Sequence, residues 1–389
     1  MSRKTTIGLF VCLVLLLIAM PLIACGPGAP AKEKVLRIAW GWDMTGPASS
    51  TALPAVKAAT SYTRWLNEEK GGIEGIRVEL LWADTGYKAD RAVAAYTSFK
   101  EQGVLATSQM AAHSVEAVKG MAERDQIPIT NISPSFKTMV PTPHPWAFSP
   151  LPMIGDGFTA FMIWLKQQGK TPAKVAILGW DSPYGRMAEE TAQRFAREYD
   201  IEVVEIQRIS PAATEATSQL TAMARANPDY IFHTTVAAPA AMILKEAKRL
   251  GIWPRIQMVG NHWDIAEETL PLAGDAVEGA IGVHPVALWA EEFPAINLAK
   301  QLQQRYQGAV LPQTGYLIGT TNIRFMWAAV EDALKEVGFD NLDGAAVKAA
   351  LEKFQDRDLG GIIPSVTLTA DDHRGPRERI IQVQKGKRV

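Results

Sequence analysis

Cysteine is scarce in this sequence of 389 residues, which contains only two. Two cysteines exclude a disulfide scaffold and any cysteine-rich zinc or iron–sulfur site. An excess of one charge is also lacking, since 40 Lys and Arg face 41 Asp and Glu, and without a basic field a dedicated nucleic-acid binder is excluded. Charged residues make up 21% of the chain, too few for a disordered protein. The length exceeds what one hydrophobic core usually serves, so we expect two lobes.

Sequence motifs for catalysis and cofactor binding are missing as well. The chain has no Gly-x-x-x-x-Gly-Lys phosphate loop, no Gly-x-Gly-x-x-Gly after a strand, no Gly-x-Ser-x-Gly elbow and no His-Glu-x-x-His. The six histidines are dispersed, and the densest ligand-like group, Asp371-Asp372-His373, lies in a polar stretch expected to be a solvated turn. We therefore expect no cofactor, no metal site and no enzyme. A Ser-His-Asp triad needs only spatial proximity, so that alternative stays open.

The N-terminal segment is predicted to be removed from the folded protein. After a short basic start, residues 7–23 form an almost uninterrupted apolar run that ends in Leu22-Ile23-Ala24-Cys25, directly before a Gly/Pro-rich stretch. Small residues after an apolar core are typical of a signal-peptidase site, and this tetrapeptide resembles the lipobox of bacterial lipoproteins. We predict a signal peptide over 1–24, lipidation of Cys25 and a linker over 25–34. The alternative is an uncleaved signal anchor with Cys25 as a bystander.

From residue 35 onward, short β-rich runs alternate with amphipathic, Ala-rich stretches, a pattern typical of buried parallel sheets with helical crossovers. The predicted strands cover 35–39, 78–82, 104–106, 129–132, 174–178, 202–206, 230–233 and 256–259. The predicted helices cover 55–69, 90–102, 114–126, a segment opened by Ser182 as N-cap, 215–226, 239–250, 290–306, 317–337 and 344–354. A Pro-rich stretch over 141–152 interrupts the alternation, which then restarts. No segment after residue 25 has 18 consecutive apolar residues, so we expect the rest of the chain to be soluble.

Polar and aromatic side chains gather just after the predicted strands. A ligand would lie between two such lobes at the carboxyl ends of their strands. Ser114 lies between a strand and a helix, where a helix N-terminus binds a carboxylate, or where the serine is merely an N-cap. Ser133, Ser135, Tyr184 and His262 follow other strands, with turn or core roles as the alternative. Five tryptophans also lie at strand ends, and we expect at least one to stack on ligand: Trp40, Trp42, Trp82, Trp180 and Trp263.

Taken together, these motifs resemble a known family. Their order is the lipobox, Met44-Thr45-Gly46-Pro47, Asn67 to Gly75, a strand ending in Asp84, Ile127-Pro128-Ile129, Asp181 to Gly185 and Asn227-Pro228-Asp229. The combination resembles the branched-chain amino-acid-type (leucine/isoleucine/valine-binding-like) solute-binding lipoproteins of ABC transporters. The resemblance covers essentially the whole mature chain. It implies an α/β, type I periplasmic-binding fold with two Rossmann-like lobes, parallel sheets and a hinge of three crossings. The implied lobes are 35–150 plus about 284–375, and 151–283 plus about 376–389.

The resemblance also implies a ligand site. Family members hold an amino acid's carboxylate with hydroxyl and backbone groups of the first lobe, which match Ser114 and, less directly, Ser133 and Ser135. The second-lobe tyrosine matches Tyr184, whereas the acidic partner of the ligand ammonium falls on His262. The full set of predicted ligand-binding residues is Trp42, His113, Ser114, Ser133, Ser135, Tyr184, Thr235, His262 and Asp264.

The histidine at 262 leaves an amino acid's ammonium without its usual partner in a closed cleft, which is costly. Asp264 is an alternative partner, two residues away. A carboxylate without an α-amino group, or an amide, therefore fits better than an aliphatic amino acid. We expect Ser114 to bind its anionic or carbonyl end, and Trp42 and Tyr184 to pack its body.

The sequence thus predicts a monomeric, extracytoplasmic binding lipoprotein, held at a membrane by N-terminal lipid. It would capture a small carboxylate, amino acid or amide and deliver it to the permease of an ABC importer, with no role for nucleic acid. Two alternatives stay open: a ligand-sensing lipoprotein that acts on a membrane receptor, and a cleft enzyme with paired acid and base groups near Ser114.

Overall fold

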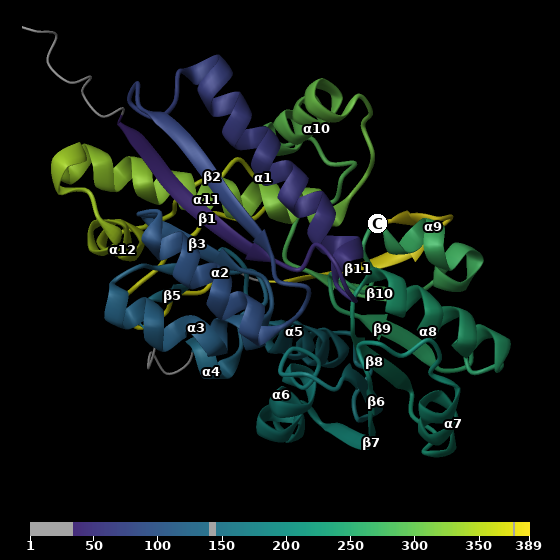
Figure 1. The fold of residues 1–389 in the computed structure, drawn as a ribbon. Helices are drawn as coiled ribbons and strands as arrows, with labels where there is room; N and C mark the ends of the chain where they lie inside the picture. The colour runs from purple at the N-terminus through teal and green to yellow at the C-terminus, as the bar shows by residue number, and fades with distance from the viewer. Residues whose placement is uncertain (1–33, 140–144, 376–377) are drawn as a thin grey trace, which may run out of the picture. The chain divides into compact units, whose positions relative to one another are not determined.

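Strands and helices alternate along the chain in the computed structural model, which describes residues 34–139, 145–375 and 378–389 (Figure 1). Residues 35–389 form one compact unit. The predicted signal peptide, the lipidated Cys25 and the linker up to residue 33 lie outside the described residues, as do Pro141, Pro143 and His144. No helix of the described part is both long enough and apolar enough to cross a membrane.

The first sheet has the strand order β2-β1-β3-β4-β5, and every pair in it is parallel. Its strands are β1 (Val35–Trp42), β2 (Arg77–Asp84), β3 (Ala106–Gln109), β4 (Ile129–Asn131) and β5 (Ala147–Phe148). Alternate residues of β1 face opposite sides, as the period of a strand requires. Leu36 and Ile38 pack toward α1 (Ser49–Lys70), whereas Ala39 packs toward α2 (Ala89–Glu101) and α3 (Ala112–Asp125).

The second sheet has the order β12-β11-β10-β9-β8-β6-β7. Its strands are β6 (Ala173–Trp180), β7 (Ile201–Ile209), β8 (Tyr230–Thr234), β9 (Gln257–Gly260), β10 (Ile281–His284), β11 (Arg379–Gln384) and β12 (Lys387–Arg388). Val175 and Ile177 of β6 face a core built with α5 (Ile154–Gln167) and α6 (Met187–Phe195). Ala176 and Leu178 face the opposite side, with α7 (Thr217–Arg225) and α8 (Ala237–Arg249). Only β11 and β12 run antiparallel to their neighbours among the described strands.

The remaining helices return to the first sheet. Helix α11 (Thr314–Val337) packs along α1, while α10 (Pro294–Gln307) and α12 (Gly344–Glu352) pack beside these two. Short helices α4 (Phe136–Met139) and α9 (Thr269–Ala273) follow β4 and β9. Three short 3₁₀ helices complete the described elements: Ala196–Tyr199, Gly274–Val277 and Phe339–Asn341.

The chain passes between the two sheets three times: after β5, after β10 and before β11. The first and third passages are hydrogen bonded to each other, because the Ser149 N–H donates to the His373 carbonyl at 2.8 Å and the Gly375 N–H donates to the Leu151 carbonyl at 3.2 Å. The second and third are joined by Arg379, whose guanidinium lies 2.8 Å from the Glu291 carboxylate. The predicted α/β class is therefore confirmed.

Some predicted elements differ from the structure. The helix expected to open at Ser182 begins at Met187 instead, and the intervening residues form turns. Ser182 caps a turn rather than a helix, since its Oγ accepts the Gly185 N–H at 3.2 Å. Gly185 lies so close to β6 that a Cβ there would be 2.1 Å from the Trp180 carbonyl oxygen, which holds the turn against the strand end.

Candidate functional site

The two sheets meet at a small cavity of about 20 Å³, which is about the space of one water molecule. Its wall is formed by residues after β1, β2, β3 and β4 on one side and after β6, β8 and β9 on the other. Strand order reverses between β1 and β3 in the first sheet and between β6 and β8 in the second. The cavity thus lies at both topological switch points, where open α/β sheets bind ligands. Its lining residues are Asp43, Ala48, Tyr87, Met110, Ala111, Ser133, Trp180, Tyr184, Val236 and Trp263.

Asp43 is the one carboxylate in this lining, and it is fully buried. It directly follows β1, and its Oδ1 accepts the Tyr87 N–H at 2.8 Å and a short hydrogen bond from the Thr85 hydroxyl. Its Oδ2 is buried and has no hydrogen-bond partner in the part of the chain that the structure describes. Burial raises the pKa of Asp43 to about 6, against an ordinary value of 3.8, because desolvation disfavours the charged form. The carboxyl is still mainly ionised at neutral pH.

Aromatic rings from both sheets enclose the cavity beside Asp43. The rings of Tyr87 and Trp180 meet edge to face with centroids 5.6 Å apart, and those of Trp180 and Tyr184 do so at 6.2 Å. The Tyr87 hydroxyl also lies 3.5 Å from Ser182 Oγ. Tyr87 therefore bridges the loop after β2 to the loop after β6.

Tyr184 has a second role through its hydroxyl. The hydroxyl donates to the Thr235 carbonyl at 2.7 Å and accepts from the Asn261 side-chain amide at 2.9 Å. Residue 239, four positions after Thr235, is a proline with no N–H to offer that carbonyl. The Tyr184 ring thus lines the cavity, while its hydroxyl ties together the loops after β6, β8 and β9.

The predicted serines lie at different depths around this cavity. Ser133 is in its lining, whereas Ser135 is buried and has its Oγ 3.3 Å from Thr138 Oγ1. Ser114 is in the first turn of α3, and the N-cap position is Ala111. The Ser114 Oγ is fully buried, and no described residue hydrogen bonds to it; Ser114 is outside the lining.

His113, next to Ser114, packs its ring against Tyr87 with centroids 4.6 Å apart. Burial lowers the pKa of His113, and its Nε2 has no hydrogen-bond partner within residues 34–139, 145–375 and 378–389. His113 therefore supports the wall of the cavity from behind Tyr87.

Trp42 lies in the core beneath the cavity. Its ring stacks on Trp40 with centroids 4.3 Å apart, and its Nε1 donates to Ser108 Oγ at 3.0 Å. Of the five tryptophans at predicted strand ends, Trp180 and Trp263 line the cavity, and Trp82 is 56% exposed on β2.

Asp264 and Thr235 are hydrogen bonded to each other and are outside the cavity lining. The buried Asp264 carboxylate accepts the Thr235 N–H at 2.9 Å, the Thr235 hydroxyl and the Asn261 N–H at 3.2 Å. His233 Nδ1 lies 3.1 Å away. His262 is also buried outside the lining, and burial lowers its pKa to about 3, so its ring is neutral.

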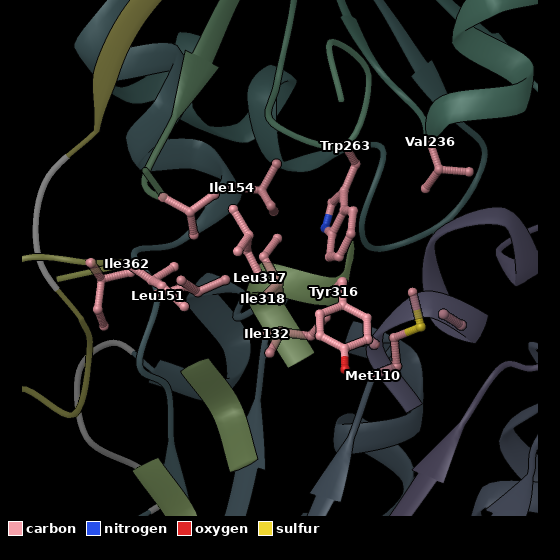
Figure 2. Packing of buried hydrophobic residues seen from close by; sticks show 14 of the residues in the cluster. Met110, Ile132, Leu151, Ile154, Val236, Trp263, Tyr316, Leu317, Ile318 and Ile362 are labelled. Atoms are coloured by element: carbon pink, nitrogen blue, oxygen red, sulfur yellow. The ribbon is translucent and has the colours of Figure 1, made fainter. Parts of the chain in front are cut away.

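An apolar cluster continues from the cavity between the sheets (Figure 2). Figure 2 shows Trp263 reaching from the second sheet toward Tyr316 of α11, with Met110 and Ile132 below it and Val236 beside it. These residues belong to one buried cluster that joins both sheets. The space between the sheets is therefore predominantly apolar, with Asp43 at its edge.

A larger open groove of about 870 Å³ lies elsewhere, over α5 and the third passage. Asp156, Trp164 and Arg374 are among its lining residues. It is formed by one face helix and a connecting segment rather than by strand ends of both sheets, so we do not assign the ligand to it. Among the described residues, no three His, Cys, Asp or Glu side chains gather as metal ligands.

Comparison with known proteins agrees with this architecture. A search of curated protein sequences finds no match. A branched-chain amino acid ABC transporter structure from Thermus thermophilus with bound valine is 24% identical, with a TM-score of 0.85, covering 92% of this chain and 96% of that one. An ABC transporter substrate-binding protein from Aeropyrum pernix is 22% identical, with a TM-score of 0.81 and coverages of 92% and 94%. A fatty acid ABC transporter substrate-binding protein from Thermomonospora curvata is 21% identical, with a TM-score of 0.79 and coverages of 90% and 89%.

These likenesses establish the fold, and they confirm the type I periplasmic-binding architecture that the sequence motifs predicted. The family model described as "Periplasmic binding protein" matches residues 35–387, which include both sheets and all three passages between them. This chain belongs to the periplasmic binding protein family.

Proposed function

We propose that this protein is an extracytoplasmic solute-binding lipoprotein that captures a small polar or carboxylated metabolite and delivers it to an ABC importer. The observation that carries the proposal is the cavity at the switch points of both sheets, with Asp43, Tyr87 and Ser133 on one side and Trp180 and Tyr184 on the other. A ligand held by residues of two sheets stabilises the state in which the sheets are close together. Such closure is a signal that a permease can recognise.

The moving parts in this proposal are two lobes, 35–150 plus about 284–375, and 151–283 plus about 376–389. The three passages between the sheets then act as the hinge. Two of them are joined by main-chain hydrogen bonds, and the second and third are joined by the Arg379–Glu291 ion pair. Because the passages are bonded to one another, we expect them to bend together. Rotation is then expected at the hinge, and each sheet moves as a rigid body.

The ligand class follows from the cavity wall. Carboxylates, amino acids and amides remain the candidates, and Ser133 and Tyr184 are the predicted binding residues that line the cavity. Asp43 repels a simple carboxylate, so an amino acid or amide fits better. Among structural relatives, the Thermus thermophilus protein contains valine and the Thermomonospora curvata protein is a fatty acid binder. The apolar cluster of Figure 2 suits a ligand with an apolar body.

The anchor in this proposal is Cys25, lipidated after removal of residues 1–24. Lipid chains hold a protein at a membrane more stably when more than one is present. Labelling with radioactive palmitate in a bacterial host should mark the wild type and leave Cys25→Ser unlabelled. Equal labelling of both would contradict the anchor without affecting the binding function.

The binding function is tested with residues 26–389, produced without the lipid. Native mass spectrometry should reveal a small molecule bound in a one-to-one ratio, recovered unchanged after denaturation. Calorimetry with that molecule should show that Trp180→Ala loses at least tenfold in affinity, because Trp180 forms part of the wall. Trp82→Ala is the matched control, since Trp82 is 56% exposed on the edge strand β2 and should bind like the wild type. Equal effects of the two changes, or chemical conversion of the ligand, would contradict the proposal.

A further inference from the structure

Asp43 is a cavity-lining residue whose buried carboxylate forms no ion pair with any described residue. Its side chain is fully buried, and among the described residues that line the cavity it is the only acidic one. No Lys, Arg or His of the described residues pairs with it, and the charged group that influences it most is another carboxylate, Asp84. An isolated buried carboxylate is unfavourable unless something compensates its charge.

The hydrogen bonds of Asp43 leave one oxygen available. Both donors, the Tyr87 N–H and the Thr85 hydroxyl, bind Oδ1. The other oxygen, Oδ2, is buried with no partner among the described residues. The protein therefore holds this carboxylate in a fixed orientation through one oxygen and leaves the second for a donor that does not belong to the described chain.

The surroundings of Asp43 are aromatic. Tyr87, Trp180, Tyr184 and Trp263 line the same cavity, with the first three in successive edge-to-face contacts. Aromatic rings attract organic cations electrostatically, and several rings together recognise alkylated ammonium groups. A carboxylate within an aromatic enclosure is thus suited to a positively charged amine with an apolar body.

We propose that the ligand carries a positively charged amino group, which Asp43 binds through Oδ2 inside the enclosure of Tyr87, Trp180, Tyr184 and Trp263. This inference rests on the proposed binding function and names its ligand class as organic cations, alkylamines with an apolar body. Asp43 then replaces the acidic residue expected at position 262, where the structure has a buried, neutral histidine. The partner of the ligand cation is then on the side of the first sheet, whereas position 262 belongs to the second sheet.

A series of three ligands of matched shape separates charge from size: isopentylamine as the cation, isovaleramide as the neutral analogue and isovalerate as the anion. Calorimetry at pH 7.5 on residues 26–389 should show at least tenfold tighter binding of the amine than of the amide, and no measurable binding of the anion. This comparison uses the wild-type protein, so it does not depend on any variant folding.

Asp43→Asn keeps the shape of the side chain and removes its charge. It should weaken isopentylamine binding by about 10- to 100-fold and leave isovaleramide binding within about threefold of the wild type. Asp181→Asn is the control, because Asp181 follows β6 near the same cavity but is exposed and paired with Arg186 at 2.6 Å. Its effect on amine binding should be less than twofold.

The outcomes separate this inference from the proposed function. Binding of the amide or the anion as tight as that of the amine, or an unchanged amine affinity in Asp43→Asn, would overturn the cation inference. If a neutral or anionic solute binds one-to-one while amines do not, the binding function stands and the cation inference fails. If native mass spectrometry and the whole series show no ligand of any charge, both fail.

Discussion

The Tyr184 hydroxyl can be tested separately from the Tyr184 ring, because removing one oxygen atom abolishes the hydrogen bonds of the hydroxyl and keeps the ring in the cavity wall. In Tyr184→Phe the aromatic ring stays in the cavity wall. The Thr235 carbonyl and the Asn261 amide lose their partner, at 2.7 Å and 2.9 Å respectively. Neither group is exposed, since Thr235 and Asn261 are both buried.

The expected cost follows from those two hydrogen bonds. A typical hydrogen bond contributes about 0.5–1.5 kcal/mol net, and a buried group left without a partner costs about 1–3 kcal/mol. The N–H that a helical turn would offer to the Thr235 carbonyl is absent, because residue 239 is a proline. We therefore expect Tyr184→Phe to lower the free energy of unfolding by about 2–3 kcal/mol.

Urea unfolding followed by intrinsic fluorescence measures this difference. Tyr199→Phe is the matched control, because the Tyr199 ring has a cation–π contact with Lys166, whereas its hydroxyl has no hydrogen bond to a described residue. The control should stay within about 0.5 kcal/mol of the wild type. A loss below about 0.5 kcal/mol in Tyr184→Phe would refute the argument that this hydroxyl ties the three loops together.

Three further predictions concern packing, pH and a helix end. Gly319→Ala should lower the free energy of unfolding by about 1–3 kcal/mol, because its Cβ would lie 2.4 Å from the Ala55 carbonyl oxygen. Gly120→Ala is the control, because a Cβ there has free space and should raise the free energy of unfolding by up to about 1 kcal/mol. Thermal or urea unfolding measures both. Between pH 4 and pH 7 the free energy of unfolding of the wild type should fall by about 2 kcal/mol relative to that of Asp43→Asn. A folded pKa of about 6 against 3.8 means that the folded chain binds the extra proton at low pH and loses that stabilisation as the pH rises; denaturant unfolding at several pH values measures it. Glu268→Ala should lower the free energy of unfolding in urea by about 2 kcal/mol, because this carboxylate accepts the first two N–H groups of α11 at 3.1 and 2.8 Å. A loss no larger than that of an exposed Glu→Ala change would contradict this prediction.

Much of the fold could be predicted from the sequence because buried parallel strands leave a strong local pattern. Short apolar runs separated by Ala-rich amphipathic stretches gave the alternation of both sheets. Helix α5 was missed, since it follows a Pro-rich stretch and has Gly155 and Gly157 in its first turn, which are typical of loops. Strand β11 was missed because it pairs with β10, about a hundred positions earlier, and such pairing has no local signature. Strand β12 pairs locally with β11 but has only two residues, too few for a strand pattern.

The candidate site was predicted in part. Tyr184 and Ser133 were found from their position just after predicted strands, and both line the cavity. Asp43 was missed because the predicted first strand ended at Ala39, whereas β1 continues through Gly41 to Trp42 and places Asp43 at the strand end. The side-chain partners of Asp264 also depend on folding, since Thr235 is 29 positions away in sequence.

The small volume of the cavity decides which interactions can favour a ligand. At about 20 Å³ it has room for one water molecule, so a larger solute must first separate Tyr87 from Trp180 and Met110 from the second sheet. Apolar contacts between ligand and wall then replace contacts that the wall already makes with itself, so their net contribution is smaller than that of a newly formed ion pair. The pairing of Asp43 Oδ2 is different, because no described residue provides it and a ligand cation adds it anew. A ligand shifts an equilibrium only by its differential affinity for the two states, so the charge on the ligand should control closure more strongly than its apolar body.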